Sequence, residues 1–241
     1  MQLFYHKDLE AGALLTLDPE ESRHAIKVLR RHAGDTLYLT NGRGEAFDCR
    51  ILDANPSACL VEASASPSAA FPSHASTPRL HLALAPTKNP ARTEWLVEKT
   101  VEMGISEIAL LQCDHSERTF LKTDRLEKLA ISAMKQSLRT TLPTILPPVS
   151  FAQWLTCRSE SQRLIAHCEA DLPRTPLASA LLPNRDTALL IGPEGDFSPS
   201  EIAAALDRGF LPVSLGHARL RTETAALFAV AAFNLINTPH S

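Results

Sequence analysis

The sequence has no apolar run long enough to cross a membrane, and its first residues lack the pattern of a secretory signal peptide. Cysteine is scarce: the five cysteines are odd in number and scattered, without a Cys-x-x-Cys pair or a Cys/His cluster. A zinc site is therefore not expected, and free, mostly packed thiols are typical of a reducing compartment. The sequence predicts a cytoplasmic protein with neither a metal nor a membrane partner.

The chain also lacks the excess of positive charge that is typical of nucleic-acid-binding proteins. It has 24 Lys and Arg against 27 Asp and Glu, so its formal net charge is −3. Residues 1–70 hold 7 basic and 10 acidic side chains, and residues 71–241 hold 17 of each. Any RNA partner must therefore be bound by a local patch.

One candidate patch lies near the N-terminus. Asp18 is positioned to cap a helix over residues 19–32, with Glu21 at its third position and Gly34 beyond its end. Four basic side chains on this helix follow the spacing i, i+4, i+7, i+8: Arg23, Lys27, Arg30 and Arg31. This spacing places them in one stripe. Composition alone favours a solvated face over an RNA contact.

A length of 241 residues allows one large domain or two small ones. Residues 64–78 are rich in Ser, Pro and Ala and lack periodicity, which is typical of a linker. Before them, three segments predict a β-meander, at 36–40, 45–52 and 59–63. We expect a small β-barrel-like domain with one helix at residues 1–70, a linker at 71–79 and a second domain at 80–241.

Beyond the linker, strand and helix patterns alternate, which predicts an α/β domain with a parallel sheet. The expected strands cover residues 80–85, 105–113, 163–169, 187–191 and 211–215, and the expected helices cover 92–103, 124–138, 199–208 and 222–234. The last helix is apolar on almost every face from residue 225 to 236. One side packed on a sheet would leave much of it exposed, so the sequence also predicts burial against a second subunit.

Two glycine-bearing loops, at residues 191–197 and 215–225, hold most of the functional information. Each follows a short apolar strand and leads into a helix. Ser198 and Glu201 form a capping box at the first helix, and Thr222 is expected to cap the second. Exits of parallel strands meet at the carboxyl edge of a sheet, where open α/β folds bind ligands. Two such loops side by side predict a cofactor site, although each alone also fits an ordinary turn or helix start.

In order and content, these loops resemble the Gly-Pro-Glu-Gly and Leu-Arg-Thr-Glu-Thr-Ala signatures of the 16S rRNA (uracil(1498)-N(3))-methyltransferase family. That family belongs to the SPOUT class of S-adenosylmethionine-dependent, trefoil-knotted methyltransferases. The resemblance extends to residues 3–6, 22–30, 98–105, 116–118 and 135–139. The sequence departs from the family pattern at Asp196, where many members have glycine, and at Leu138.

The resemblance implies a PUA-like RNA-binding β-barrel domain followed by an α/β-knot catalytic domain that forms a homodimer. It implies that the basic stripe binds 16S rRNA, within the small ribosomal subunit. The cofactor, S-adenosylmethionine, is expected at His167, Ile191, Gly192, Pro193, Glu194, Gly195, Leu215, Gly216, Leu220, Thr222, Thr224 and Ala225. The loops lack the Gly-x-Gly-x-x-Gly fingerprint of dinucleotide sites, so their glycines are expected to admit the ligand to the backbone.

Two catalytic residues are expected in the second loop. Uracil N3–H is weakly acidic, so a group must accept its proton or stabilise the uracil anion. Arg221 is expected to pair with a uracil carbonyl oxygen or the adjacent phosphate. Glu223 is the candidate base, and Glu194 is the second candidate. The other interpretation is that these carboxylates only brace their loops. Two other functions stay open: a SPOUT methyltransferase acting on another RNA or atom, and a non-enzymatic RNA-binding or ribosome-assembly factor.

Overall fold

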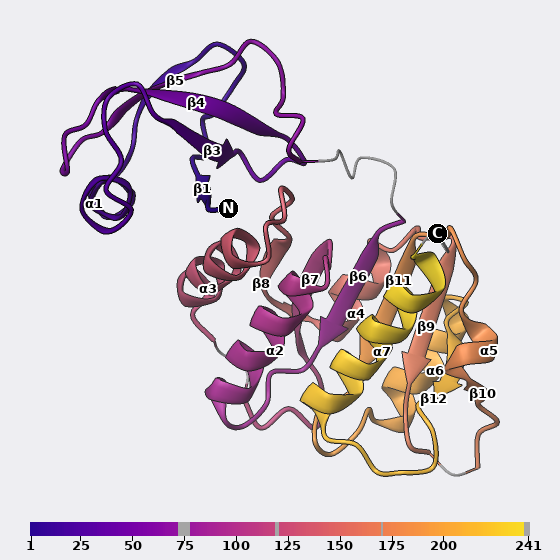
Figure 1. Cartoon of the computed structure of the whole chain (residues 1–241). Coiled ribbons are helices and arrows are strands. Elements are labelled where there is room, and N and C mark those ends of the chain that lie inside the picture. Colours follow the sequence, from indigo (N-terminus) through magenta and orange to yellow (C-terminus); the bar gives the residue numbers. More distant parts are fainter. Residues whose placement is uncertain (72–77, 119–120, 170, 239–241) are drawn as a thin grey trace. The chain divides into compact units, whose positions relative to one another are not determined.

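The computed structural model describes residues 1–71, 78–118, 121–169 and 171–238. It consists of two compact units (Figure 1). The first comprises Met1–Ala75 and Ile131–Leu142, and the second comprises Ser76–Ala130 and Pro143–Ser241. Most of the expected linker at 71–79 lies outside the described residues. Residues 131–142 group with the first unit, although the sequence placed them in the second domain.

The first unit is built on a curled five-stranded sheet in the order β1-β3-β4-β5-β2. Its strands are β1 (Leu3–Tyr5), β2 (Leu14–Thr16), β3 (Thr36–Thr40), β4 (Ala46–Asp53) and β5 (Leu60–Ala63). The predicted meander β3–β4–β5 is confirmed. The three-residue strands β1 and β2 were not predicted, because so short a segment shows no periodicity. Apolar side chains from this sheet, including Phe4, Leu39 and Phe47, form a buried core.

The prediction of a helix over residues 19–32 was wrong in its length, because the helical region ends at Val28. Asp18 caps it as expected, accepting from the backbone N–H groups of Glu20 and Glu21. However, α1 (Pro19–Arg23) passes into a π-helical turn, η1 (His24–Val28), and Arg30 has a left-handed φ of 55°. The left-handed Arg30 ends the helical region, and the chain then returns to the sheet, where Gly34 N–H donates to the Ile51 carbonyl oxygen of β4 at 2.8 Å.

The second unit contains a seven-stranded sheet in the order β10-β12-β9-β11-β6-β7-β8, and all of its strand pairs are parallel. The strands are β6 (Leu80–Leu84), β7 (Glu107–Gln112), β8 (Thr144–Ser150), β9 (Gln162–Ala166), β10 (Thr175–Pro176), β11 (Thr187–Ile191) and β12 (Leu211–Ser214). The predicted parallel α/β layout is thereby confirmed. Edge strand β8 was not predicted, because its two prolines disguise it.

Helices cover both faces of this sheet. The helices of this unit are α2 (Pro90–Glu102), α4 (Phe151–Thr156), α5 (Leu177–Ala180), α6 (Pro199–Asp207) and α7 (Thr222–Asn237). Helix α3 (Thr123–Gln136) begins in this unit, and its residues from Ile131 onward group with the first unit. Helices α2 and α7 lie side by side on one face, and α4 and α6 lie on the other (Figure 1). Every residue of β11 is buried as a result. Polar chemistry is therefore confined to the loops at the edges of the sheet.

Within the described ranges, no helix is long and apolar enough to span a membrane. The five cysteines are free thiols: Cys49, Cys59 and Cys113 are buried, and Cys157 and Cys168 are exposed. Burial raises the pKa of the Cys49 thiol to about 12. Buried, protonated thiols of this kind are packing groups and not reactive nucleophiles.

Candidate cofactor and catalytic site

Three strand exits meet at the carboxyl edge of the parallel sheet. We predicted that the loops after β11 and β12 would lie side by side, and this was wrong: β9 pairs with both strands and lies between them. The order of strands depends on long-range crossovers, which local sequence does not encode. The exit of β9, beginning at His167, therefore occupies the centre of the predicted site.

The loop after β11 is fixed by Asp196. This residue has a left-handed φ of 64°, a conformation that aspartate tolerates better than most residues other than glycine. One carboxylate oxygen of Asp196 accepts from Phe197 N–H at 2.9 Å. The other accepts from Cys168 N–H at 2.6 Å. Asp196 thus joins the β11 loop to the exit of β9.

Close packing within the protein disfavours a side chain at the two glycines of the β11 loop. A Cβ on Gly192 would lie 3.2 Å from the Phe197 backbone nitrogen and from Asp196 Oδ1. A Cβ on Gly195 would lie 3.2 Å from the Cβ of His115, whose Nδ1 is 3.1 Å from the Gly195 carbonyl oxygen. His115 follows β7, so a third element supports this loop.

Thr222 joins the second loop to the first. We predicted that Thr222 would cap α7, and this was wrong: the N-cap is Arg221, and Thr222 is the first residue of the helix. The Thr222 hydroxyl instead donates to the Gly192 carbonyl oxygen at 3.1 Å. The Thr222 hydroxyl is thus engaged in a tertiary hydrogen bond and does not cap the backbone N–H groups of α7. Gly216, earlier in the same loop, has a φ of 102° and open space beside it.

Arg92, on α2, bridges the two loops. Its Nη1 lies 3.3 Å from Glu194 Oε1, and its Nε lies 3.6 Å from Glu223 Oε1. The Glu223 side chain is only 10% exposed, and its Oε2 is buried without a hydrogen-bond partner among the described residues. Sequence reasoning missed Arg92. One sequence signal could have identified Arg92. It is a cation in the first turn of a helix that has no acidic residue there, and the helix dipole disfavours a cation at that end.

His167 presents an unpaired donor at the centre of this edge. It is buried, and its Nδ1 accepts from Glu169 N–H at 3.2 Å, so the ring proton lies on Nε2. Burial lowers the pKa of His167, which keeps the imidazole neutral. Nε2 is buried and has no partner within the described residues. Leaving such a donor unpaired is costly, so the position suits an acceptor atom on a ligand.

The other predicted residues take distinct places around this edge. Ile191, Pro193 and Ala225 are buried, Leu215 and Leu220 are half-buried, and Thr224 is exposed. Arg221 is exposed, and its side chain has no hydrogen bond or ion pair to another described residue. No group of three or more His, Cys, Asp or Glu that could hold a metal occurs in the part of the chain that the structure describes.

The basic residues predicted to bind RNA belong to the first unit and are all exposed: Arg23, Lys27, Arg30 and Arg31. They do not form the straight helical stripe that we predicted. The π-helical turn changes the angular spacing between Arg23 and Lys27, and Arg30 and Arg31 lie beyond the end of the helix.

Comparison with known families agrees with this arrangement. Residues 74–234 match a family described as an RNA methyltransferase domain, and residues 17–64 match one described as an RNA methyltransferase PUA domain. The fold and the site therefore define an RNA methyltransferase with an N-terminal PUA domain.

Individual relatives indicate which family of RNA methyltransferases this chain belongs to. A crystal structure of a "probable rRNA-methyltransferase" from Porphyromonas gingivalis is 41% identical, covers 98% of both chains and has a TM-score of 0.90. Ribosomal RNA small subunit methyltransferase E from Neisseria gonorrhoeae, bound to S-adenosyl methionine, is 26% identical over 98% of both chains, with a TM-score of 0.79. The curated protein of the same name from Buchnera aphidicola is 26% identical, over 96% of this chain and 91% of its own. This chain belongs to the ribosomal RNA small subunit methyltransferase E family.

Proposed function

We propose that this protein transfers a methyl group from S-adenosylmethionine to N3 of a uridine in 16S ribosomal RNA, at position 1498 by family resemblance. One observation carries the proposal: three strand exits are joined by Asp196 and Thr222 around the unpaired Nε2–H of His167. The family relationship and the S-adenosyl methionine bound by the Neisseria gonorrhoeae relative support it.

The residues at this edge fit the cofactor. His167 Nε2–H offers a donor to an acceptor atom of the ligand, and the β11 loop and the second loop supply backbone groups. We assign the cofactor to His167, Ile191, Gly192, Pro193, Glu194, Gly195, Leu215, Gly216, Leu220, Thr222, Thr224 and Ala225. The cofactor supplies a methyl group on a cationic sulfur, so positioning by these rigid loops supplies much of the rate enhancement.

Arg221 and Glu223 are the residues that we assign to the uracil. The guanidinium of Arg221 is exposed and free to pair with a uracil carbonyl oxygen or the adjacent phosphate. Glu223 has one oxygen near Arg92 and one without a partner, and we assign that second oxygen to accept the N3 proton. A Glu223→Gln variant with an unchanged rate across a pH series would reassign Glu223 to bracing the loop.

The experiment that tests the function compares 3-methyluridine in small-subunit rRNA from cells with and without the gene. Loss of the modification at one position, restored by the wild-type gene, is the expected result. A different modified nucleotide would support a methyltransferase acting on another atom or RNA. An unchanged rRNA together with no S-adenosylmethionine binding in calorimetry would support a non-enzymatic assembly factor.

We also propose that the basic residues of the first unit bind the rRNA. Reversing Lys27 and Arg30 to Glu should weaken RNA binding and lower the slope of log K against log salt by about 0.7 to 0.9 per lost phosphate contact. Filter binding over a salt series measures both. Lys7 and Arg50 are also exposed in this unit, and reversing them is the matched control. Equal losses in the two double variants would show only a general charge effect.

The second unit has an exposed apolar stripe on α7. We propose that two copies of the chain form a homodimer through this stripe. Phe228, Ala231 and Leu235 follow the spacing i, i+3, i+7 on α7, and all are exposed. Phe228 is 50% exposed and Leu235 is 72% exposed, and on the adjacent α2 Trp95 is 43% exposed. Large apolar side chains that are exposed together on neighbouring helices are typical of an association surface.

Light scattering at micromolar concentration should give about twice the chain mass of 26.3 kDa. Replacing Phe228 and Leu235 with Asp should produce monomers, because two desolvated carboxylates would face a symmetric interface. Leu52→Asp, at an exposed leucine of the first unit, is the control and should remain dimeric. A monomeric wild-type protein with full activity would contradict the proposal.

A further inference from the structure

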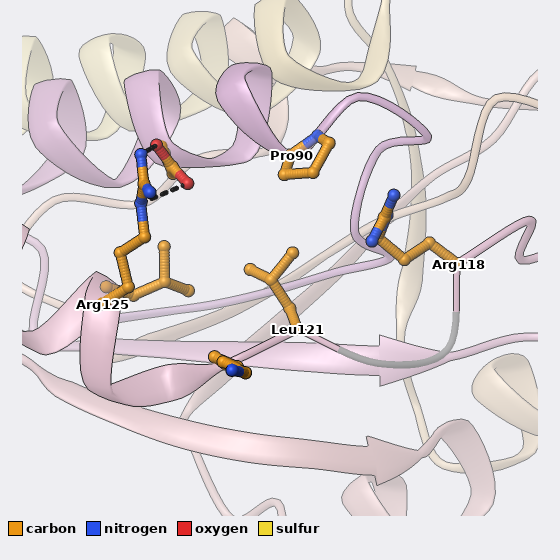
Figure 2. A pocket seen from close by; sticks show the side chains of 7 residues that line it. Pro90, Arg118, Leu121 and Arg125 are labelled. Carbon is orange, nitrogen blue, oxygen red and sulfur yellow. Dashed lines mark hydrogen bonds and ion pairs between the residues drawn. The ribbon is translucent and has the colours of Figure 1, made fainter.

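A cavity of about 250 Å³ opens in the second unit beside the first turns of α2 and α3 (Figure 2). Its lining residues are Pro90, Glu94, Arg118, Leu121, Lys122, Arg125 and Leu126. None of them belongs to the candidate cofactor site. The volume is below the range of roughly 300–1,000 Å³ that is typical for drug-sized ligands, so the cavity suits a group about as large as one nucleobase.

The cavity combines an apolar wall with unpaired positive charge. Pro90 and Leu121 face it together with the Arg118 side chain, as Figure 2 shows, and Leu126 is fully buried behind them. Arg125 is neutralised, since its Nε and Nη2 lie 2.7 Å and 2.8 Å from the two oxygens of Glu94. Arg118 donates through Nε to the Lys88 carbonyl oxygen at 3.2 Å.

Two cations of the cavity are available to a ligand. Neither Arg118 nor Lys122 has a carboxylate partner among the described residues, and the nearby Glu117 is paired with Lys88 at 2.7 Å. The net charge of the cavity is therefore positive. An apolar wall beside free cations matches a nucleotide, whose base stacks on flat or apolar groups while its phosphate pairs with Arg or Lys.

The cavity lies close to the candidate catalytic site along the first turn of α2. Pro90 and Glu94 are one helical turn apart and line the cavity, whereas Arg92 between them contacts Glu194 and Glu223. The two sites are thus separated by about one helix diameter, roughly 10 Å. That distance corresponds to about three nucleotides at ~3.4 Å per stacked step.

We propose that this cavity binds a nucleotide of the substrate RNA that lies about three nucleotides from the methylated uridine. Its base packs against Pro90 and Leu121, and its phosphate pairs with Arg118 and Lys122. The inference rests on the proposed function, because it requires an RNA strand whose target uridine lies at the Arg221 and Glu223 loop.

The first test uses Arg118→Gln and Lys122→Gln, with Lys128→Gln as the control, since Lys128 is an exposed lysine of the nearby α3 that does not line the cavity. Each cavity variant should raise the Kd for an rRNA fragment containing the target uridine by about tenfold. It should also raise KM more than it lowers kcat, and should leave S-adenosylmethionine affinity unchanged. Unchanged RNA affinity, or an equal loss in the control, overturns the proposal.

The second test changes only the RNA. Abasic residues are placed one at a time within four nucleotides of the target uridine, and binding to the wild-type protein is measured. One position should weaken binding, and that loss should disappear in the Arg118→Gln/Lys122→Gln protein. If no abasic position weakens binding, the proposal is overturned. It is also overturned if the variants are defective only on assembled ribosomal subunits, because that result would indicate that a protein occupies the cavity. Failure of the proposed function gives a different result. The wild-type protein would then not methylate the RNA fragment, whereas its affinity for that fragment would still be measured.

Discussion

Replacing Arg221 with alanine is expected to reduce the rate of methyl transfer by about a hundredfold or more, the usual cost of removing one donor that stabilises developing negative charge. The side chain is exposed and makes no hydrogen bond or ion pair to another described residue, so its loss leaves no buried group unpaired. The affinity for S-adenosylmethionine should therefore change little. Single-turnover kinetics on an rRNA fragment and calorimetry on the same sample measure the two quantities.

Arg219→Ala is the matched control, because Arg219 is an exposed arginine two residues earlier in the same loop. It should retain most of the activity. Arg221→Lys should recover only part of the rate, since an ammonium group cannot reproduce the planar guanidinium fork. Parallel losses of cofactor affinity and rate in the alanine variant would instead assign Arg221 to the cofactor.

Replacing Gly195 with valine is expected to abolish detectable S-adenosylmethionine binding. The new Cβ would lie 3.2 Å from the Cβ of His115, and the branched methyl groups would displace the histidine. His115 Nδ1 also lies 3.0 Å from the Asp196 carbonyl oxygen, so its displacement would disturb the residue that joins the β11 loop to the β9 exit. The expected readout is loss of the rise in melting temperature that the cofactor gives the wild-type protein.

Two variants separate this effect from general destabilisation. Ala204→Val adds similar bulk at an exposed position of α6 and should keep the cofactor-induced rise in melting temperature. Gly195→Ala should weaken binding less than valine, because glycine 195 has no left-handed φ and only the single close contact must relax. Normal cofactor binding by a folded Gly195→Val protein would remove this loop from the site.

The sequence predicted best the elements whose burial dictates their pattern. Strands β3 and β11 begin and end at the predicted residues, because polar turns bound both the fully buried β11 and the mostly buried β3. Edge strand β8, with two prolines, and the short strands β1 and β2 have no such pattern. The N-terminal helix was predicted too long because it passes into a π-helical turn and ends before the left-handed Arg30, and arginine at that position is no signal of a helix end.

The same distinction applies to the candidate site. The two loops were recognisable because glycine and capping residues leave local signals. The contacts that join those loops are tertiary: Thr222 to Gly192, Asp196 to Cys168, and Arg92 to Glu223. The position of β9 between β11 and β12 is also tertiary, so the central place of His167 could not be derived from spacing.

The Thr222–Gly192 and Glu223–Arg92 contacts have a consequence for synthesis of the protein. Their partners are 30 and 131 residues apart in the chain, so neither contact exists until residues 222 and 223 have left the ribosome. The first unit has its whole sheet from residues 3–63 and can begin to fold much earlier, as N-terminal domains do during translation. A nascent chain should therefore gain affinity for RNA before it gains affinity for the methyl donor.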